Sequence, residues 1–508
     1  AQASFGEGLA WGIAVFALFA ATAPRMSDTL LLGNDVVPYA AALAGGASEG
    51  LFNPHHLLFH LLAAAVAPAV ELAGAAPVFA ALTAQVILSA LGGALATAAV
   101  WRATRALAGI GAARILALLF ATSIGNWLYG SVGETYLPAT AALAWLWSDA
   151  IVARSRGAAL SAWRIGAWAL LACLLRQDSV LALPFIAMVV PWRRALVGLA
   201  GAGVVCVVVY ALAYVISAPA VPFVAWLRGL AATGLWGATP GTREVLSALV
   251  LTVAAHAWAV ARVALELVAG RAPGLEALLA AAPLLVFAGA LPFVRAKTGV
   301  MRLRTLGIAL ALFAAARFAF FAWWQPTNLE YHAGTLLPLV LLIAVGLAAG
   351  GGAPSKARLT LVALGALLGA LGNAALLLEP GRAAHAQSRA QIAFAFAGPT
   401  GTVVALDAIA HYAHVRARDV ATTPRLIDAS ALASGADLVA LEALAVDLEQ
   451  ALQRDERVVL SIDLVTPALI GTAPPHVDSG VLARLAGLAA PRRERDPNGV
   501  VWLVVLER

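Results

Sequence analysis

Runs of about 20 apolar residues recur from the N-terminus to about residue 378, and this repetition restricts the fold more than any other feature. Each run is long enough to cross the roughly 30 Å hydrocarbon core of a bilayer as a helix. The composition agrees, because 62% of the residues are hydrophobic and only 12% are charged, where a soluble domain has about a quarter. The sequence therefore predicts an all-α polytopic membrane protein.

The net charge of +6 does not indicate nucleic-acid binding. The basic residues form short clusters between the apolar runs, which is the distribution that the positive-inside rule describes for cytoplasmic loops. The two cysteines, Cys173 and Cys206, lie inside apolar runs. They form no metal-binding motif, and we interpret them as small buried hydrophobic side chains.

The order of apolar and polar segments gives a predicted topology. A first helix ends at Pro24 and is followed by an outer polar loop, residues 25–53, and a segment, 55–72, that we expect to lie along the membrane interface. Charged residues near 175–179 divide the run 165–190 into two short spans that meet at an outer turn. The other predicted spans and apolar runs are 78–100, 115–129, 139–152, 195–216, 245–268, 277–293, 305–323, 335–349 and 359–378. We expect about 11–13 transmembrane helices.

The later topology depends on a basic cluster, residues 295–304. If this cluster is cytoplasmic, one of the two preceding runs is re-entrant or split, and the segment with Glu330, Tyr331 and His332 lies outside. If the cluster is external, it is suited to phosphate binding. We favour the first interpretation.

The composition changes after residue 378, where apolar stretches shorten and charges become frequent. Strands are predicted at 402–406, 457–462 and 500–506, and helices at 441–453 and 481–488. We therefore expect two domains: a membrane domain, residues 1–378, and a small soluble α/β domain, residues 379–508, on the outer side.

Polar residues gather in three outer elements of the predicted topology. They are Asp35 and Tyr39 with the histidines His55, His56 and His60 in and after the first outer loop, Glu134 and Tyr136 after the third span, and Arg176 with Asp178 at the divided run. A carboxylate can accept a proton from a hydroxyl, and an arginine can bind a phosphate through two hydrogen bonds. This set is suited to sugar transfer from a phosphate-linked donor.

Structural roles explain the same residues in a different way. Asp35 and Glu134 could each cap a helix, and the histidines could be hydrogen-bonding groups at the interface. A zinc site is disfavoured, since the adjacent His55 and His56 face different ways on a helix. Arg176 and Asp178 could be a structural ion pair, because charges at membrane depth need partners.

Over residues 8–195 the order of these elements resembles the GT-C superfamily of integral membrane glycosyltransferases, in particular the protein O-mannosyltransferase-like branch and the lipid A aminoarabinose transferases. The motifs that carry the resemblance are the aspartate loop, Asn53-Pro54-His55-His56, the small-residue-rich span after it, and Gly133-Glu134-Thr135-Tyr136. Relatives have an acidic pair where this chain has Asn34-Asp35, and often Pro-Pro where it has His55-His56.

The resemblance implies that Asp35 is the catalytic base or positions the acceptor, that Glu134 is the second acidic group, and that Arg176 lies near the lipid phosphate. The predicted substrate-binding residues are Tyr39, His55, His56, Tyr136, Arg176, Asp178, Glu330, Tyr331 and His332. No metal ligand is assigned. Since some GT-C enzymes use a divalent metal ion and others do not, the cofactor stays open.

The sequence thus predicts an inverting glycosyltransferase of a bacterial inner membrane, with its active site facing the periplasm or exterior. Its partners would be membrane lipids, a polyprenyl-phosphate sugar donor, and a protein, lipid or glycan acceptor. A transporter or flippase of lipid-linked sugars is the alternative, but it predicts paired internal repeats, and we find no clear repeat. A structural membrane subunit is the third hypothesis, but it does not explain the polar cluster.

Overall fold

The computed structural model divides the chain into two compact units. The first covers described residues up to Glu379 and the second covers those from Pro380 onward. The described residues are 2–26, 39–40, 43–44, 51–75, 77–228, 245, 249, 301–324, 331, 333–349, 354–378, 397–398, 400–405, 425–428, 438–461, 490–495 and 501–507.

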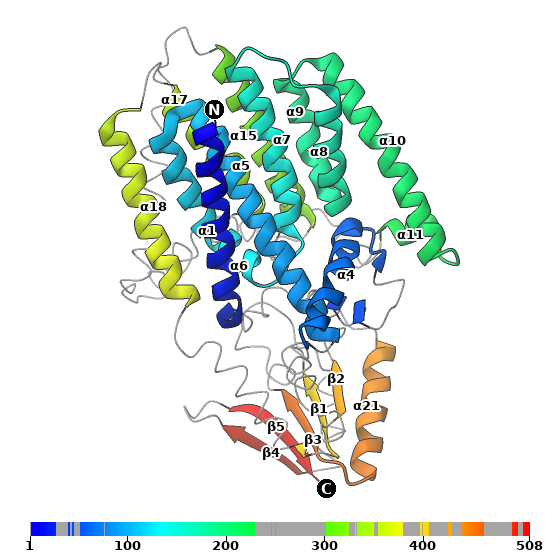
Figure 1. The fold of residues 1–508 in the computed structure, drawn as a ribbon. Helices are drawn as coiled ribbons and strands as arrows, with labels where there is room; N and C mark the ends of the chain where they lie inside the picture. Colours follow the sequence, from blue (N-terminus) through cyan, green and yellow to red (C-terminus); the bar gives the residue numbers. More distant parts are fainter. Residues whose placement is uncertain are drawn as a thin grey trace. The chain divides into compact units, whose positions relative to one another are not determined.

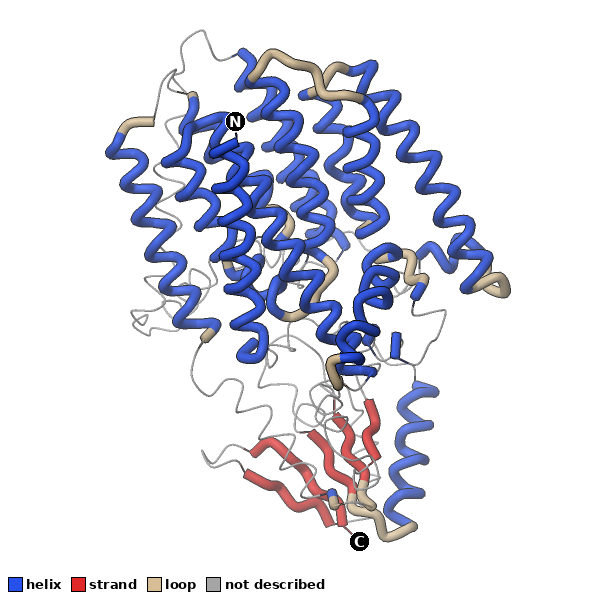
Figure 2. The backbone as a smooth tube through the Cα atoms, in the orientation of Figure 1, coloured by secondary structure: helices blue, strands red, loops and turns tan. Residues whose placement is uncertain are grey.

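The first unit is a bundle of helices (Figures 1 and 2). Its elements are α1 (Gln2–Met26), α4 (Leu57–Leu72), α5 (Pro77–Thr122), α6 (Ile124–Ser131), α7 (Tyr136–Ser155), α8 (Ala162–Leu175), η2 (Gln177–Ala182), α9 (Leu183–Val189), α10 (Trp192–Ser217), α11 (Phe223–Arg228), α15 (Met301–Trp324), α17 (Leu336–Ala348) and α18 (Lys356–Leu377). Five of the described helices are long and apolar enough to cross a membrane, namely α1, α5, α10, α15 and α18. The predicted polytopic membrane fold is confirmed.

Helix α5 is interrupted at Gly109, inside the expected gap between spans 78–100 and 115–129, and the segments on either side of this break both pack against α1, so the two predicted spans are present. The break is confined to Gly109, whose φ of 84° and ψ of 178° lie in a region that is essentially restricted to glycine. The expected span 115–129 is itself two pieces, since α6 starts after Ser123. The Ser123 hydroxyl accepts a hydrogen bond from the Asn126 amide at 3.4 Å and caps α6.

Glycines bring the central helices into close contact. A Cβ on Gly92 of α5 would lie 2.6 Å from the carbonyl carbon of Leu137 in α7, and a Cβ on Gly166 of α8 would lie 2.7 Å from the carbonyl oxygen of Gly198 in α10. Helices in membranes associate through small residues that allow the backbones to approach in this way. The Gly92 contact fixes the first turn of α7 against α5.

Helices α8 and α9 form a short hairpin with η2 at its tip. Helix α8 has 14 residues, and η2 and α9 return over residues Gln177–Val189. At 1.5 Å per residue, α8 is about 21 Å long, which is less than the roughly 30 Å of a hydrocarbon core. The predicted division of the run 165–190 is confirmed, and the charged residues lie at its tip.

The second unit contains a five-stranded sheet in the order β2-β1-β3-β5-β4. The strands are β1 (Thr402–Ala405), β2 (Arg425–Asp428), β3 (Val458–Ser461), β4 (Ala490–Arg495) and β5 (Val501–Glu507), and α21 (Leu438–Gln453) precedes β3. Strand β1 is parallel to β2 and β3, whereas β5 is antiparallel to β3 and β4. The three predicted strands and the helix at 441–453 are confirmed, but β2 and β4 were not predicted. The expected helix 481–488 lies outside the described residues.

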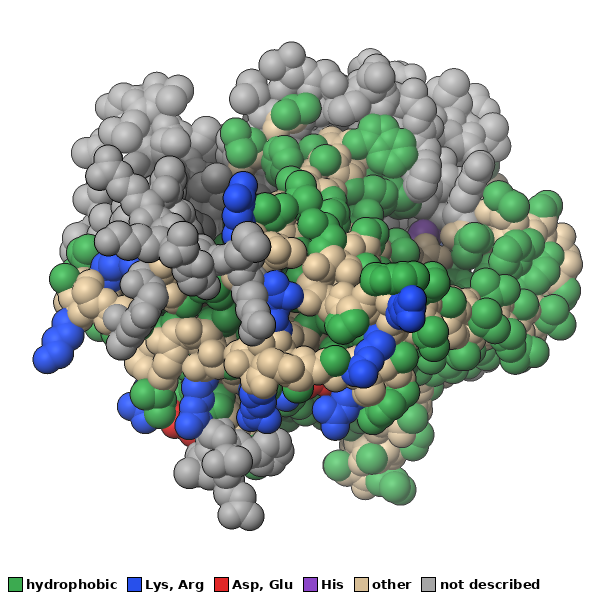
Figure 3. All heavy atoms as spheres, turned by 90° about the horizontal axis from the view of Figure 1, so that it is seen from above, with side chains coloured by type: hydrophobic (Ala, Val, Ile, Leu, Met, Phe, Trp, Pro, Cys, Tyr) green, Lys and Arg blue, Asp and Glu red, His purple; other side chains and the backbone are tan. Residues whose placement is uncertain are grey.

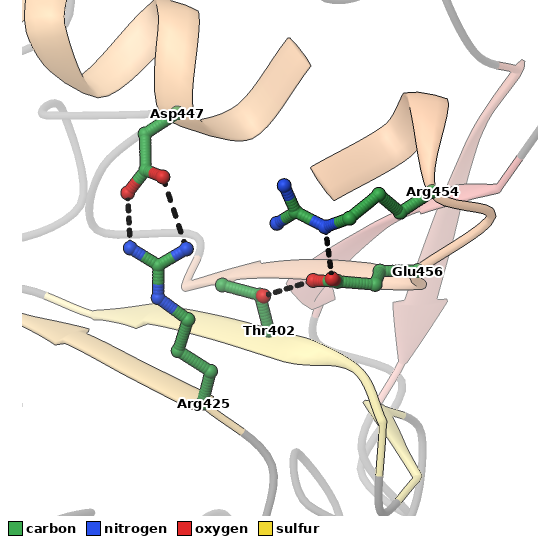
Figure 4. Close-up of polar contacts among 5 residues, drawn as sticks. All are labelled: Thr402, Arg425, Asp447, Arg454 and Glu456. Atoms are coloured by element: carbon green, nitrogen blue, oxygen red, sulfur yellow. Dashed lines mark hydrogen bonds and ion pairs between the residues drawn. The ribbon is translucent and has the colours of Figure 1, made fainter. Parts of the chain in front are cut away.

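Two ion pairs lie beside the strands of this unit, between Arg425 and Asp447 and between Arg454 and Glu456 (Figure 4). Arg454 donates from Nε to Glu456 at 2.6 Å, and the Thr402 hydroxyl donates to the other Glu456 oxygen at 3.1 Å. Arg425 holds Asp447 through two guanidinium nitrogens. Glu456 therefore connects the start of β1 to the residues just before β3.

Candidate functional site

Arg176 and Asp178 lie where the backbone leaves helix α8. Arg176 is extended, with φ −156° and ψ 127°, and Asp178 belongs to the 3-10 turn that follows. The Nε of Arg176 donates to one Asp178 carboxylate oxygen at 2.9 Å. The expected interaction between these residues is therefore present, and both side chains are largely buried.

A second arginine completes a triad with this pair. Nη2 of Arg317, in α15, lies 3.2 Å from the other oxygen of Asp178. Arg317 is 4% exposed, and its Nε has no hydrogen-bond partner among the described residues. Two guanidinium groups share one carboxylate, so these three side chains carry a net charge of +1. A buried excess of positive charge is costly without a counter-ion, and the triad is therefore suited to binding an anion.

Aromatic rings surround Arg176. Its Cζ lies 3.6 Å from the ring centre of Tyr136 and 5.8 Å from that of Tyr331, and the two tyrosine rings are 5.8 Å apart. Nη1 of Arg176 also donates to the Thr135 hydroxyl at 3.0 Å. These contacts hold the guanidinium in one orientation, because it is fixed from its face and from its edge.

Glu134 lies in the turn that leads into α7, and it is 2% exposed. Gly133 has a φ of +87°, which a glycine adopts without steric cost. The Ser89 hydroxyl of α5 donates to the Glu134 backbone carbonyl. The turn is thus fixed to α5, and it brings Glu134, Thr135 and Tyr136 next to the arginine site through the Arg176–Thr135 hydrogen bond.

The first outer element contacts the η2 turn and α10. The amide of Gln177 donates to the His55 carbonyl at 3.4 Å, and the Tyr210 hydroxyl of α10 donates to the Pro54 carbonyl at 2.9 Å. Asn53 accepts a hydrogen bond from the His55 amide through its side chain at 2.9 Å. These hydrogen bonds use backbone atoms of the loop, so they do not involve its histidine side chains.

Tyr39 and two histidines form an aromatic cluster beside this loop. The Tyr39 ring centre lies 4.4 Å from that of His60 and 6.0 Å from that of His56. His60 is fully buried, and neither of its ring nitrogens has a hydrogen-bond partner within the described part of the chain. A buried imidazole without a partner is available to a ligand hydroxyl or amide.

The three predicted outer elements thus converge, together with Tyr331 from the later segment. Asp35, Glu330 and His332 lie outside the described residues. Arg317 was not predicted, although a single charge inside the apolar run 305–323 is a signal that a partner exists. Among the described residues, no group of three histidine, cysteine or carboxylate side chains could hold a metal ion.

No protein-family model matches the chain, and no curated protein matches its sequence. The structure does resemble solved proteins. ArnT from Cupriavidus metallidurans bound to undecaprenyl phosphate has a TM-score of 0.58 at 14% identity, covering 98% of each chain. Its apo form has a TM-score of 0.56 at 14% identity, over 99% of this chain and 98% of the other.

The oligosaccharyltransferase of Archaeoglobus fulgidus in its apo form has a TM-score of 0.50 at 15% identity, covering 97% of this chain and 74% of its own. These matches extend over both units of the chain, whereas the sequence resemblance covered only residues 8–195. At such low identity they establish the architecture and not the substrates. The chain therefore has a GT-C-like membrane fold.

Proposed function

We propose that the protein is an inverting glycosyltransferase that moves a sugar from a polyprenyl-phosphate donor to the hydroxyl of a protein, lipid or glycan acceptor. The observation that carries this proposal is the buried triad of Arg176, Asp178 and Arg317, with its net positive charge. The similarity to ArnT with bound undecaprenyl phosphate supports the class of donor.

The triad suits a phosphate leaving group. When the bond between the anomeric carbon and the phosphate oxygen breaks, the electron pair stays on that oxygen and the phosphate gains negative charge. Positive groups that are already in place stabilise this charge most effectively, because they need no reorganisation during the reaction. Arg176 is oriented in advance by Asp178, Thr135 and Tyr136, and it would contact the departing phosphate.

A carboxylate is needed to accept the proton of the acceptor hydroxyl as its oxygen attacks the anomeric carbon. We assign this role to Asp35, and we assign Glu134 to the second acidic position. Tyr39, His55, His56 and Tyr331 border the arginine site or the histidine cluster and would contact the sugar or the acceptor. Glu330 and His332 are assigned to substrate binding by their place in the sequence. Attack from the face opposite the phosphate inverts the anomeric configuration.

The orientation follows from the charges at the ends of α7. This helix begins with Tyr136 beside the triad and ends next to Arg154 and Arg156. By the positive-inside rule the arginine end is cytoplasmic, so the triad faces the outer side, which is the periplasm if the membrane is a bacterial inner membrane.

The test is sugar transfer by purified protein in nanodiscs. Radiolabelled polyprenyl-phosphate sugars are supplied with a cell-envelope extract as acceptor, and Asp35→Asn is compared with the wild type. We expect Asp35→Asn to reduce transfer by about 10²- to 10⁴-fold, and the product to have the anomeric configuration opposite to that of the donor. Asp28→Asn, in the same loop, is the matched control and should retain transfer.

Full activity of Asp35→Asn would overturn the assignment of the base. If no donor in the panel is consumed, a transbilayer assay with the same lipids tests the flippase alternative directly. Movement of the intact donor across the bilayer without cleavage would then replace the proposed transfer reaction.

A further inference from the structure

Helix α10 lies at the edge of the bundle and exposes most of its apolar side chains. Figure 3 keeps the left-to-right order of Figure 1, and hydrophobic side chains cover the edge to which α10 and α11 belong. Val204, Val207 and Leu212 of α10 are each more than half exposed. Such side chains on a helix that is long enough to cross a membrane face lipid. A polar side chain of α10 that points into the bundle is therefore an exception.

Tyr210 is this exception. It is 9% exposed, and its hydroxyl donates a hydrogen bond to the Pro54 carbonyl at 2.9 Å. Its ring belongs to an apolar cluster with Leu57 at the start of α4, Leu174 near the end of α8 and Trp226 of α11. A buried tyrosine hydroxyl usually finds a polar partner, and here the partner connects α10 to the loop that precedes α4.

The packing of α8 against α10 places Tyr210 at the level of the η2 turn. Both helices start at the same end of the bundle, because α9 returns the chain between them (Figure 1). The backbones meet at Gly166 and Gly198, which lie 11 residues before Gln177 (166 to 177) and 12 residues before Tyr210 (198 to 210). Both distances correspond to a rise of about 17–18 Å. The Gln177 side chain accordingly lies next to the Tyr210 hydroxyl.

The loop of residues 53–56 thus makes two contacts through neighbouring carbonyl groups. The Pro54 carbonyl accepts from Tyr210 at 2.9 Å, and the His55 carbonyl accepts from the Gln177 amide at 3.4 Å. Gln177 directly follows Arg176 in the chain. Since a hydrogen bond of 3.4 Å is longer than usual, the bond from Tyr210 is the stronger of the two. It therefore contributes most to holding this loop beside the arginine turn.

The contacts that orient Arg176 do not involve Tyr210. They are the hydrogen bonds to Asp178 and Thr135 and the stacking on Tyr136. Loss of the Tyr210 hydroxyl should therefore leave the guanidinium in place. It should displace the loop with its two histidines relative to the guanidinium, because the Pro54 carbonyl would be left without its donor.

We propose that Tyr210 is a positioning residue, whose hydroxyl holds the loop of residues 53–56 at a fixed distance from Arg176. The groups of this loop then meet the sugar or the acceptor while Arg176 contacts the departing phosphate. The inference rests on the proposed function, since it assigns Tyr210 to the transfer reaction. Displacement of a group whose contacts form mainly in the transition state lowers the rate and leaves substrate affinity unchanged.

The test is steady-state sugar transfer in nanodiscs with varied donor concentration. Tyr210→Phe keeps the ring and its packing but loses the hydroxyl. We expect kcat to fall about tenfold, with the KM for the donor within about twofold of the wild type. Tyr214→Phe is the matched control, because this tyrosine lies one turn later in α10 and its hydroxyl donates to the Val221 carbonyl at 2.6 Å. The control should lose a similar amount of thermal stability and keep the kcat of the wild type.

Hydrogen exchange at the Gln177 amide adds a readout that does not depend on activity. Exchange should be faster in Tyr210→Phe than in Tyr214→Phe, because the loop that accepts the hydrogen bond of this amide is held less firmly. An unchanged exchange rate would contradict the proposed displacement even if Tyr210→Phe were inactive for another reason.

Equal kcat values in Tyr210→Phe and Tyr214→Phe would overturn the inference and leave the proposed function intact. A raised KM with unchanged kcat in Tyr210→Phe would also overturn it, because the hydroxyl would then act in donor binding. If the wild type consumes no donor, the proposed function itself fails, and the role of Tyr210 in transfer fails with it.

Discussion

The guanidinium carbon of Arg176 lies 3.6 Å from the ring centre of Tyr136. Both residues are buried, and a cation stacked on a ring that is shielded from water is worth about 2 kcal/mol. The contact holds one face of the guanidinium, so the phosphate of the proposed donor would approach its remaining edge. Removing the ring should therefore weaken the binding of an anionic donor.

We predict that Tyr136→Leu raises the KM for the donor about tenfold, since it removes the ring but keeps an apolar side chain. Tyr136→Phe keeps the ring and should stay within about twofold of the wild type. Steady-state transfer kinetics with varied donor distinguish the two variants. Equal losses in both would mean that the hydroxyl, and not the ring, carries the effect.

The carboxylate of Asp178 is the only acidic group in the triad, so its removal leaves two buried guanidinium groups without their counter-ion. We predict that Asp178→Asn lowers the free energy of unfolding by about 3 kcal/mol. Arg317→Met should partly restore the stability of Asp178→Asn, because the double variant has one uncompensated charge fewer. Thermal unfolding of the wild type, Asp178→Asn, Arg317→Met and the double variant in the same detergent measures this coupling. Strictly additive losses of stability would contradict it.

Gly334 makes room for the second arginine of the triad. A Cβ at this position would lie 2.7 Å from Cζ of Arg317, so Gly334→Ala must displace the guanidinium from Asp178. We predict a loss of about 1–3 kcal/mol in stability, together with weaker donor binding.

Gly307→Ala, in the same helix as Arg317, is the control for Gly334→Ala. Its Cβ would lie at an ordinary 3.6 Å from Val345, and alanine is favoured over glycine inside a helix by up to about 1 kcal/mol. This variant should be as stable as the wild type or more so. A Gly334→Ala protein that behaves like Gly307→Ala would show that Arg317 adapts without cost.

Glu456 should make the second unit sensitive to acid. The hydrogen bond from Arg454 lowers the pKa of Glu456 below its usual value, and the bond from Thr402 adds to this effect. The resulting stability is complete above the usual glutamate pKa of about 4.3, and it is lost as the pH falls through the lower pKa of the folded state.

Hydrogen exchange of the Thr402 amide, which donates to the Arg457 carbonyl at 2.8 Å, reports on this junction. After correction for intrinsic rates, protection should fall between about pH 5 and about pH 3 in the wild type. It should be lower and less dependent on pH in Glu456→Gln, while Asp455→Asn should follow the wild type. A wild-type profile that does not change with pH would refute the assignment.

The sequence predicted those site residues that interrupt or separate apolar runs. Arg176 and Asp178 were found because they divide an apolar run, and Glu134 and Tyr136 because they lie between two spans. Arg317 was missed because it lies alone in a long span, where one arginine does not end the helix. Its partner, Asp178, comes from a segment almost 140 residues away in the sequence, and only the folded bundle brings the two together.

Prediction from local sequence pattern was also incomplete where tertiary contacts decide the secondary structure. The loop expected between spans 78–100 and 115–129 is reduced to a break at Gly109, because the helices on both sides extend into the basic segment 101–114. Strand β4 has the sequence Ala-Pro-Arg-Arg-Glu-Arg, which has low strand propensity. It pairs with β5 at the edge of the sheet, where proline and charged residues are tolerated.

The shortness of the α8–α9 hairpin limits which acceptors the proposed enzyme can use. Trp163 at the start of α8 is 69% exposed with Arg164 over its ring, and an exposed tryptophan beside a basic residue is typical of the headgroup level. From Trp163 to Arg176 the chain rises about 20 Å, roughly two-thirds of the thickness of the hydrocarbon core. The triad is thus recessed below the opposite membrane surface. An acceptor must extend its hydroxyl several ångströms into the protein, so chain ends, flexible loops and lipid headgroups can reach the donor, whereas hydroxyls on a flat folded surface cannot.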